Sequence, residues 1–185
     1  DGTASGTLNV TTGASASSLI GLAFIVHDHS GGRIGCAILS EGESATLLAE
    51  AFVPYYTYED SLAVGGTVGP MVTSGTTQTF YYSLTGVDTD CSSGAGSAGN
   101  SCGIHIHAGS TCTDDAGGHY YTGAVTADPW TSIAYTSDAD GTASGTLNVT
   151  TGASASSLIG LAFIVHDHSG GRIGCAILSE GESAT

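Results

Sequence analysis

The chain has 185 residues, of which 41% are hydrophobic, and its 17 acidic residues outweigh two arginines to give a formal net charge of −15. A surface of that charge repels nucleic acid and anionic membranes, so neither is expected as a partner. No apolar run approaches the roughly 18 residues of a transmembrane helix, so membrane insertion is not expected either.

An internal repeat dominates the sequence. Residues 1–46 recur letter for letter as residues 140–185, at an offset of 139 residues. A repeat at domain-sized spacing is typical of a tandem array, and 139 residues is a normal size for one domain with a full core. We therefore expect residues 45–185 to form one complete unit. Residues 1–44, the copy of 140–183, are expected to be the C-terminal part of a preceding repeat.

Short apolar stretches separated by Gly and Ser predict an all-β fold. In the first copy we expect the strands Thr3–Thr12, Leu19–His27 and Arg33–Leu39. In the complete unit we expect Thr46–Val53, Thr77–Leu84, Gly103–Ala108, Thr131–Thr136, Thr142–Thr151, Leu158–His166 and Arg172–Leu178, with Val68–Thr73 as a weaker candidate. Three strands cannot cover a core by themselves, so residues 1–46 are expected to complete another unit rather than to form a domain. The short junction near Glu41–Ser44 favours a stiff array, such as a fibre.

The cysteines indicate disulfides. The chain has five, and because Cys36 is the copy of Cys175, one unit holds four. An even number in a chain rich in Gly, Ser and Thr predicts two disulfides and a secreted, extracellular protein. Four cysteines allow three pairings, and spacing alone does not choose between them. One bridge closing the Gly/Ser-rich loop between Cys91 and Cys102 is a natural hypothesis. The absence of any Cys-x-x-Cys argues against a zinc site built from cysteines.

A glycosylation sequon occurs in both copies. Asn148-Val149-Thr150 repeats Asn9-Val10-Thr11. Because residues of a strand alternate between its faces, Asn148 is expected to point outward while Leu147 and Val149 point inward. The sequence therefore predicts N-linked glycan at Asn148 and Asn9.

The histidines of one unit lie in three short motifs: His105-Ile106-His107, His119, and His166-Asp167-His168. Two histidines at positions i and i+2 of a strand share a face, which places two imidazoles side by side. Ligation by imidazole alone suits copper, zinc, iron or nickel and does not suit calcium or magnesium. The alternative, a set of unrelated surface or core histidines, explains this concentration less well.

Four motifs resemble the copper/zinc superoxide dismutase family. Gly103-Ile104-His105-Ile106-His107 and Cys112-Thr113-Asp114-Asp115-Ala116-Gly117-Gly118-His119-Tyr120 resemble its first copper-binding stretch. Leu158–His166 resembles the strand with the last copper ligand, and Arg172–Leu178 resembles the closing strand with its active-site Arg and Cys. The order and rough spacing of the motifs agree across nearly the whole unit.

The resemblance implies an eight-stranded Greek-key β-barrel, here tandemly repeated. It implies that copper binds His105, His107, His119 and His166, with His27 as the repeat copy of His166. It further implies that Arg172 docks the superoxide anion and that His119 is catalytic. Either the free nitrogen of His119 takes up a proton when copper is reduced, or His119 stays bound to copper. The implied disulfides are Cys112–Cys175 and Cys91–Cys102, which leave Cys36 for a cysteine of a neighbouring unit.

The chain departs from the zinc-binding members of that family. No histidine lies between His119 and His166, so copper without zinc is expected. The pattern is more similar to the copper-only superoxide dismutase repeat proteins, a similarity that Asp128-Pro129-Trp130 shares. Asp114, Asp115, Asp140 and Asp167 are candidates for orienting the ligands, and His168 is best interpreted as an ordinary loop histidine.

Two functions fit these observations. The first is an extracellular copper protein that dismutates superoxide, assembled as a fibre through neighbouring repeats or copies of itself. The second is a structural, glycosylated filament that reuses the same barrel without activity. The ligand set and Arg172 favour the first, whereas the perfect repeat, the short junction and the sequon favour the second.

Overall fold

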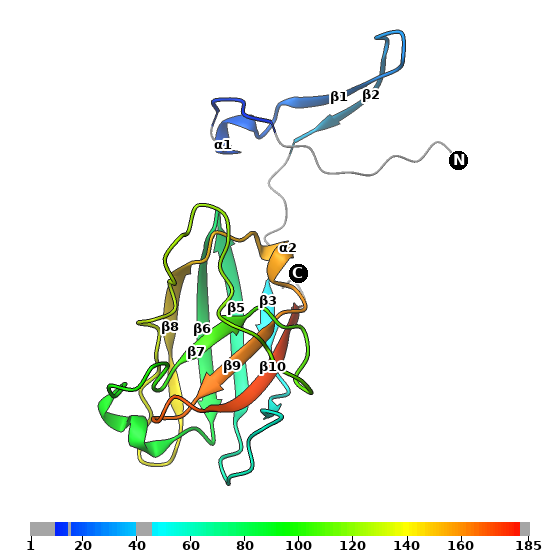
Figure 1. Cartoon of the computed structure of the whole chain (residues 1–185). Coiled ribbons are helices and arrows are strands. Elements are labelled where there is room, and N and C mark those ends of the chain that lie inside the picture. Colours follow the sequence, from blue (N-terminus) through cyan, green and yellow to red (C-terminus); the bar gives the residue numbers. More distant parts are fainter. Residues whose placement is uncertain (1–9, 15, 40–45, 182–185) are drawn as a thin grey trace. The chain divides into compact units, whose positions relative to one another are not determined.

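The structure, a computed structural model, describes residues 10–14, 16–39 and 46–181 (Figure 1). The chain divides into two compact units, Asp1–Glu43 and Ser44–Thr185, and each is described by itself. Among the described residues, no helix has the length and apolar character to cross a membrane.

The smaller unit is a β-hairpin preceded by one helical turn. α1 (Ala16–Leu19) leads to β1 (Ala23–His27), which pairs antiparallel with β2 (Arg33–Ile38). These two strands are the ones predicted at Leu19–His27 and Arg33–Leu39, although the first begins later because the chain turns at Gly21, whose φ is +82°. Most of the strand predicted at Thr3–Thr12 lies outside the described residues.

The larger unit is one curled antiparallel sheet (Figure 1). Its strands are β3 (Leu47–Ala49), β4 (Val53–Pro54), β5 (Gly65–Ser74), β6 (Thr77–Thr85), β7 (Ile104–His107), β8 (Ala143–Thr150), β9 (Ala162–His166) and β10 (Arg172–Glu180). A 3-10 turn, η1 (Thr89–Ser93), and a short helix, α2 (Ala155–Leu158), complete it. The strand order is β7-β9-β10-β3-β5-β6-β8, and β4 pairs with β10. The predicted all-β class is confirmed, and the sheet forms a half-barrel with β7 and β8 at its two ends.

Three predicted strands differ from the structure. Thr46–Val53 is broken into β3 and β4, because Ala51 adopts a positive φ of +55°. Leu158–His166 starts as the end of α2 and joins a strand only at Ala162. The prediction at Thr131–Thr136 was wrong, since only Ala134 forms a bridge there.

That third segment turns because of the residues that precede it. The Asp128 carboxylate accepts a hydrogen bond from the Trp130 backbone N–H at 2.9 Å, and the Ile133 N–H donates to the Trp130 carbonyl. An aspartate that caps the backbone two residues ahead offers the chain a turn in place of a sheet ladder. Apolar alternation in this segment was therefore a poor guide.

The hydrophobic core fills the concave side of the sheet. Phe80 packs edge-on against Phe163 with ring centroids 5.7 Å apart, and Trp130 lies 6.5 Å from Phe80. Ile104 and Ile106 of β7 and Val165 of β9 join this cluster. The alternate residues of β9, Ala162 and Ile164, belong to a second apolar cluster on the opposite face, together with Cys175 and Ala116. Both faces of β7 and β9 are therefore covered, which explains why every residue of these strands is buried.

Adjacent residues of β6 provide a test of this arrangement. Phe80 is fully buried, whereas Tyr81 is 52% exposed. We expect Phe80→Ala to lower the free energy of unfolding by about 3–5 kcal/mol, because it leaves a cavity beside Phe163 and Trp130. Tyr81→Ala should change it by about 0.5 kcal/mol or less. Urea denaturation followed by tryptophan fluorescence measures both, and equal losses would contradict the placement of the core.

Candidate metal centre

Three of the four predicted ligands share one face of two neighbouring strands. His105 and His107 lie on β7, and His166 ends β9. In the antiparallel register of these strands, His105 pairs with Ile164 and His107 with Ala162, so His166 projects from the same face as both. The His166 N–H donates to the carbonyl of Gly103 at 2.8 Å, which fixes the end of β9 against the start of β7.

The glycine at the start of the first motif has a steric role. A Cβ at Gly103 would lie 2.3 Å from Cε1 of His105. No real side chain tolerates that distance, so the ring of His105 occupies space that only glycine leaves free. The structure thereby accounts for the Gly in Gly103-Ile104-His105-Ile106-His107.

A loop that crosses this face brings in the fourth ligand. His119 forms an isolated bridge with His107, and the following residue, Tyr120, donates its N–H to the Ile106 carbonyl at 2.8 Å. His105, His107 and His166 are each 1% exposed beneath this covering, while the side chain of His119 is 10% exposed. His119 is thus the most exposed of the four imidazoles, although its side chain is still largely buried.

Each imidazole is oriented by a hydrogen bond from one of its ring nitrogens. Nε2 of His105 donates to the Ile133 carbonyl at 2.9 Å, Nδ1 of His107 to Gly117 at 2.9 Å, and Nδ1 of His166 to Gly170 at 3.0 Å. Nδ1 of His119 lies 2.7 Å from Oδ2 of Asp128. Carbonyl and carboxylate oxygens can only accept hydrogen bonds, so each ring carries its hydrogen on the nitrogen that faces such an oxygen. The lone pair therefore lies on the other nitrogen.

The other four nitrogens are buried and have no hydrogen-bond partner: Nδ1 of His105 and Nε2 of His107, His119 and His166. They lie within 4.8 Å of one another. Nitrogens bound at about 2.0–2.1 Å to one ion can lie at most about 4.2 Å apart, so the widest pair is no more than roughly half an ångström beyond what one cation spans. Buried lone pairs without a partner are costly, and a shared metal ion would satisfy all four.

Burial keeps these rings neutral. It lowers the pKa of His105 to about 2, with a further contribution from the neighbouring His166 and His119. Burial likewise lowers the pKa of His107 to about 3 and that of His166 to about 4. At neutral pH His105, His107 and His166 therefore present unprotonated nitrogens, the form in which histidine binds metals.

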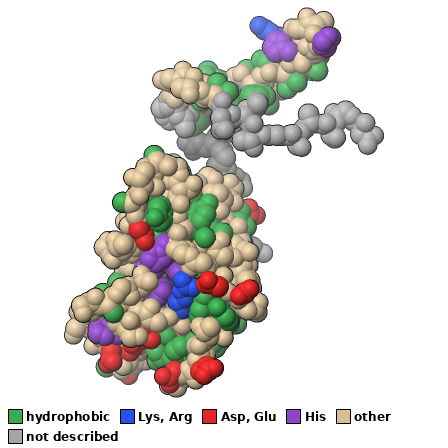
Figure 2. Space-filling model, in the orientation of Figure 1, with side chains coloured by type: hydrophobic (Ala, Val, Ile, Leu, Met, Phe, Trp, Pro, Cys, Tyr) green, Lys and Arg blue, Asp and Glu red, His purple; other side chains and the backbone are tan. Residues whose placement is uncertain are grey.

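Arg172 lies beside the cluster, and Figure 2 shows an Arg or Lys side chain next to histidine on the drawn face of the larger unit. It begins β10 opposite His166, and its Nη2 donates to the Gly117 carbonyl at 2.6 Å, the same oxygen that orients His107. Its Nη1 donates to the Tyr55 hydroxyl at 2.6 Å and to Oδ1 of Asp115 at 2.9 Å. These contacts hold the guanidinium group of Arg172 at the edge of the histidine cluster.

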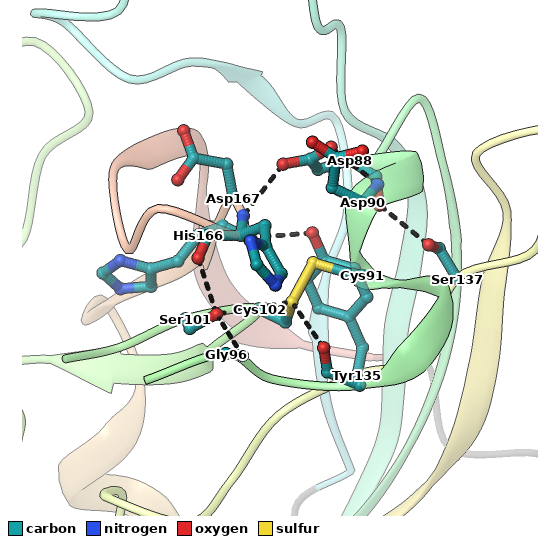
Figure 3. Close-up of a disulfide and its surroundings, with 12 residues drawn as sticks. Asp88, Asp90, Cys91, Gly96, Ser101, Cys102, Tyr135, Ser137, His166 and Asp167 are labelled. Atoms are coloured by element: carbon teal, nitrogen blue, oxygen red, sulfur yellow. Dashed lines mark hydrogen bonds between the residues drawn. A yellow bond between two sulfur atoms is a disulfide. The ribbon is translucent and has the colours of Figure 1, made fainter. Parts of the chain in front are cut away.

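Both disulfides are formed, as Cys91–Cys102 and Cys112–Cys175. The first braces the end of β9: Cys102 donates its N–H to the Asp167 carbonyl at 2.8 Å, and the nearby Tyr135 hydroxyl donates to the His166 carbonyl at 2.8 Å (Figure 3). The second links β10 to the loop that precedes His119. Two disulfides are typical of proteins from oxidising compartments.

The structure thus brings together His105, His107, His119 and His166, with Arg172 beside them. It does not bring in His27, which is exposed in the smaller unit, and Cys36 is a free, exposed thiol there. His168 lies outside the four-histidine cluster. Asn148 is exposed on β8, where its Oδ1 accepts a hydrogen bond from Thr79, and Asn9 lies outside the described residues.

Sequence reasoning missed the carboxylate that orients His119. Among the described residues it is Asp128, and none of the four predicted candidates holds an imidazole of the cluster. Asp115 binds Arg172, Asp167 accepts hydrogen bonds within its own turn, Asp114 accepts from the Asp115 N–H, and Asp140 donates its own N–H to Asp138. The available signal was the motif Asp128-Pro129-Trp130, which lies nine to eleven residues after His119.

Comparison with known proteins does not assign the chain to a family. No family model matches the sequence, and no curated protein matches it. The resemblance to superoxide dismutases therefore rests on the four sequence motifs, with which the curled sheet and its two disulfides are compatible.

The hydrogen bond from His119 to Asp128 can be tested by a nearly isosteric change. In Asp128→Asn, an amide group facing Nδ1 of His119 would donate to that nitrogen and move the ring hydrogen to Nε2, which could then no longer bind metal. We expect metal affinity to fall about 10- to 100-fold, as measured by competitive chelator titration. Asp138→Asn, a surface aspartate that caps a turn, is the control. Unchanged affinity in Asp128→Asn would contradict this role.

The buried histidines also predict a dependence of stability on pH in the metal-free protein. In the unfolded chain each titrates near 6.5, whereas the folded pKa values of His105, His107 and His166 are about 2, 3 and 4. Below pH 6.5 the unfolded state binds protons at these histidines and the folded state does not. The free energy of unfolding therefore falls by about 1.4 kcal/mol per group for each pH unit. Their contribution to stability is thus fully present above pH 6.5 and is lost as pH falls.

Urea denaturation at intervals between pH 7 and pH 5 measures this loss. In His107→Gln the slope should decrease by about one proton, because one titrating group has been removed. A free energy of unfolding that stays constant from pH 7 to pH 5 would contradict the burial of these rings in the metal-free state.

Proposed function

We propose that the larger unit is a copper-binding, superoxide dismutase-like domain that converts superoxide to oxygen and peroxide. The observation that carries this proposal is the convergence of four buried imidazole nitrogens, each without a partner, beside a fixed arginine. The resemblance in sequence supplies the reaction, and the geometry is compatible with it.

Copper is the metal that this donor set favours. Four neutral nitrogens with no carboxylate or thiolate suit a borderline ion, and copper has the highest affinity in the divalent series. The sequence between His119 and His166 contains no further histidine, so we propose that the domain works without zinc. His119 then has Asp128, in place of a second metal, at its outer nitrogen.

Bound copper would supply the redox chemistry, alternating between its two oxidation states as it takes one electron from a first superoxide and gives one to a second. The balanced reaction consumes two superoxide ions and two protons and yields one oxygen and one hydrogen peroxide. The protein must therefore bind a small anion and deliver protons.

The residues around the cluster fit these two tasks. Arg172 provides the positive charge that would dock superoxide, and its contacts with Tyr55 and Gly117 fix its direction. His119 is the most exposed of the four rings and carries a proton on Nδ1 that Asp128 holds. If Nε2 of His119 also takes up a proton, the Asp128 carboxylate stabilises the resulting cation. We propose that His119 is the group that gains and gives up a proton during turnover.

We further propose that such units are arranged in tandem in an extracellular filament. Support comes from the letter-for-letter repeat, in which residues 1–44 would belong to a preceding unit and residues 45–185 to a complete one. The two disulfides fit an oxidising environment, and the exposed Asn148 fits an N-linked glycan. A filament without activity is the alternative, and the test below separates the two.

Reconstitution with copper tests the proposed function. The oxidised, metal-free protein should bind one Cu²⁺ per chain with a nitrogen-rich electron paramagnetic resonance spectrum, and pulse radiolysis should detect dismutation. We expect Arg172→Ala to lower the rate about tenfold or more, because the local attraction for the anion is lost. Asp138→Asn is the control, since Asp138 caps an exposed turn of the same unit and is not part of the histidine cluster. A copper-loaded protein without dismutase activity would favour the structural filament, and tighter binding of zinc than of copper would contradict the choice of metal.

A further inference from the structure

The two copies of the repeated segment form the same hairpin. In β1–β2, Ala23 pairs with Ile38 and Ile25 with Cys36; in β9–β10, Ala162 pairs with Ile177 and Ile164 with Cys175. Both ladders have an irregularity at the same place, beside the histidine that ends the first strand. His27 donates to Gly31 at 2.9 Å just as His166 donates to Gly170 at 3.0 Å. The local sequence thus specifies the hairpin in either context.

Only the second copy has a core to pack on. Phe163, Val165 and Ile173 are fully buried, whereas their counterparts Phe24, Val26 and Ile34 are 49%, 48% and 65% exposed. Within the described residues of its own unit, the first hairpin leaves most of its apolar side chains exposed. A contiguous apolar surface of this kind usually marks a face that binds a partner.

The surface that fits it is present in the same chain. β9 and β10 lie between β7 and β3 in the sheet and pack on Phe80 and the other core residues. Because residues 1–46 are identical to residues 140–185, every side chain of the first hairpin matches that position. The occupant is therefore identified by sequence and not only by chemical type.

The link between the first hairpin and β3 is long enough for the hairpin to reach the position of β9–β10. β10 runs antiparallel to β3, with Leu178 opposite Ala49 and Glu180 opposite Leu47, and the Gly181 N–H donates to the Thr46 carbonyl at 2.6 Å. In the first copy, Leu39 is the counterpart of Leu178 and residue 41 that of Glu180. If the first hairpin took the place of β9–β10, residues 42–46 would join it directly to β3. Five residues is an ordinary length for a loop between antiparallel neighbours.

We propose that residues 1–46 and 140–185 are alternative completions of one core, and that residues 1–46 of the same chain can occupy the place of residues 140–185. The two states have the same side-chain contacts and differ in how the segment is connected. In the exchanged state His27, Arg33 and Cys36 replace His166, Arg172 and Cys175, and Cys36 forms the bridge to Cys112. In a tandem array, each repeated segment lies between two cores and fits both. This proposal concerns folding and does not depend on the metal or on any activity.

A disulfide reports which segment is in place. In Cys175→Ser, Cys112 has lost its partner. Cys36 can form a disulfide with Cys112 only if the first hairpin occupies the position of β9–β10, because the Cα atoms of Cys112 and Cys175 are 5.6 Å apart there. The full chain is refolded from the reduced state under oxidising conditions with a metal chelator and is then mapped by proteolysis and mass spectrometry. The substitution also makes the two copies distinguishable by mass.

We expect a Cys36–Cys112 disulfide in monomeric protein. Phe24→Asp combined with Cys175→Ser is the control: a charge on the apolar face should prevent docking and abolish the bridge, which excludes chance pairing of two thiols. A free Cys112, or a Cys36–Cys112 bridge found only in covalent dimers, would overturn the proposal, the second outcome by showing that the hairpin completes another molecule.

A pair of equivalent substitutions gives a second readout. Phe163→Asp should leave a folded protein, because the first copy can replace the damaged segment, and Phe24→Asp should do so because the second copy remains. The double variant should lose cooperative thermal unfolding. If Phe163→Asp is as unstable as the double variant, the first copy does not complete the core and the proposal is wrong.

Discussion

The antiparallel pairing of β7 with β9 is the constraint on which the site depends. Its register places His105, His107 and His166 on one face of the sheet, while Ile104, Ile106 and Val165 face the core. A shift of one residue would send the imidazoles into the core and the isoleucines outward. The hydrogen bond between His166 and Gly103 and the disulfide that braces Cys102 both lie at the end of this pair. The fold thus holds the register most firmly where three ligands meet.

Placing imidazoles on that face creates a requirement that the loops after β7 and after β9 fulfil. Three buried rings need acceptors for their N–H groups, and the loops supply the carbonyls of Ile133, Gly117 and Gly170. The loop after β7 also contributes His119 and the carboxylate of Asp128. One nitrogen of each ring is hydrogen-bonded to a carbonyl or to Asp128. The other nitrogen therefore has a free lone pair, so the rings already have the tautomer and orientation that a bound cation requires. Their lowered pKa values are the electrostatic counterpart of that arrangement.

The position of the one arginine in the larger unit is also fixed by its contacts. The larger unit contains a single arginine among many acidic side chains, and that arginine lies at the metal cluster. Its bonds to Tyr55, Asp115 and Gly117 prevent it from pairing with other acidic residues of the surface. Asp115 in turn has its pKa lowered by the Gly117 N–H and by Arg172, so it stays ionised. A strongly negative unit in this way holds its one arginine beside the histidine cluster.

The sequence by itself determined the all-β class, most strands, the histidines of the cluster and the formation of the same hairpin by both copies of the repeated segment. Local patterns carry that information: strand alternation fixed the shared face of His105 and His107, and a letter-for-letter repeat makes two hairpins with one register. The sequence did not determine that Thr131–Thr136 would turn, that Asp128 would hold His119, or that Phe163 is buried while the identical Phe24 is exposed. Those outcomes were decided by tertiary structure, because each depends on a partner distant in the chain: a ring that needs an acceptor, or a core that covers an apolar face.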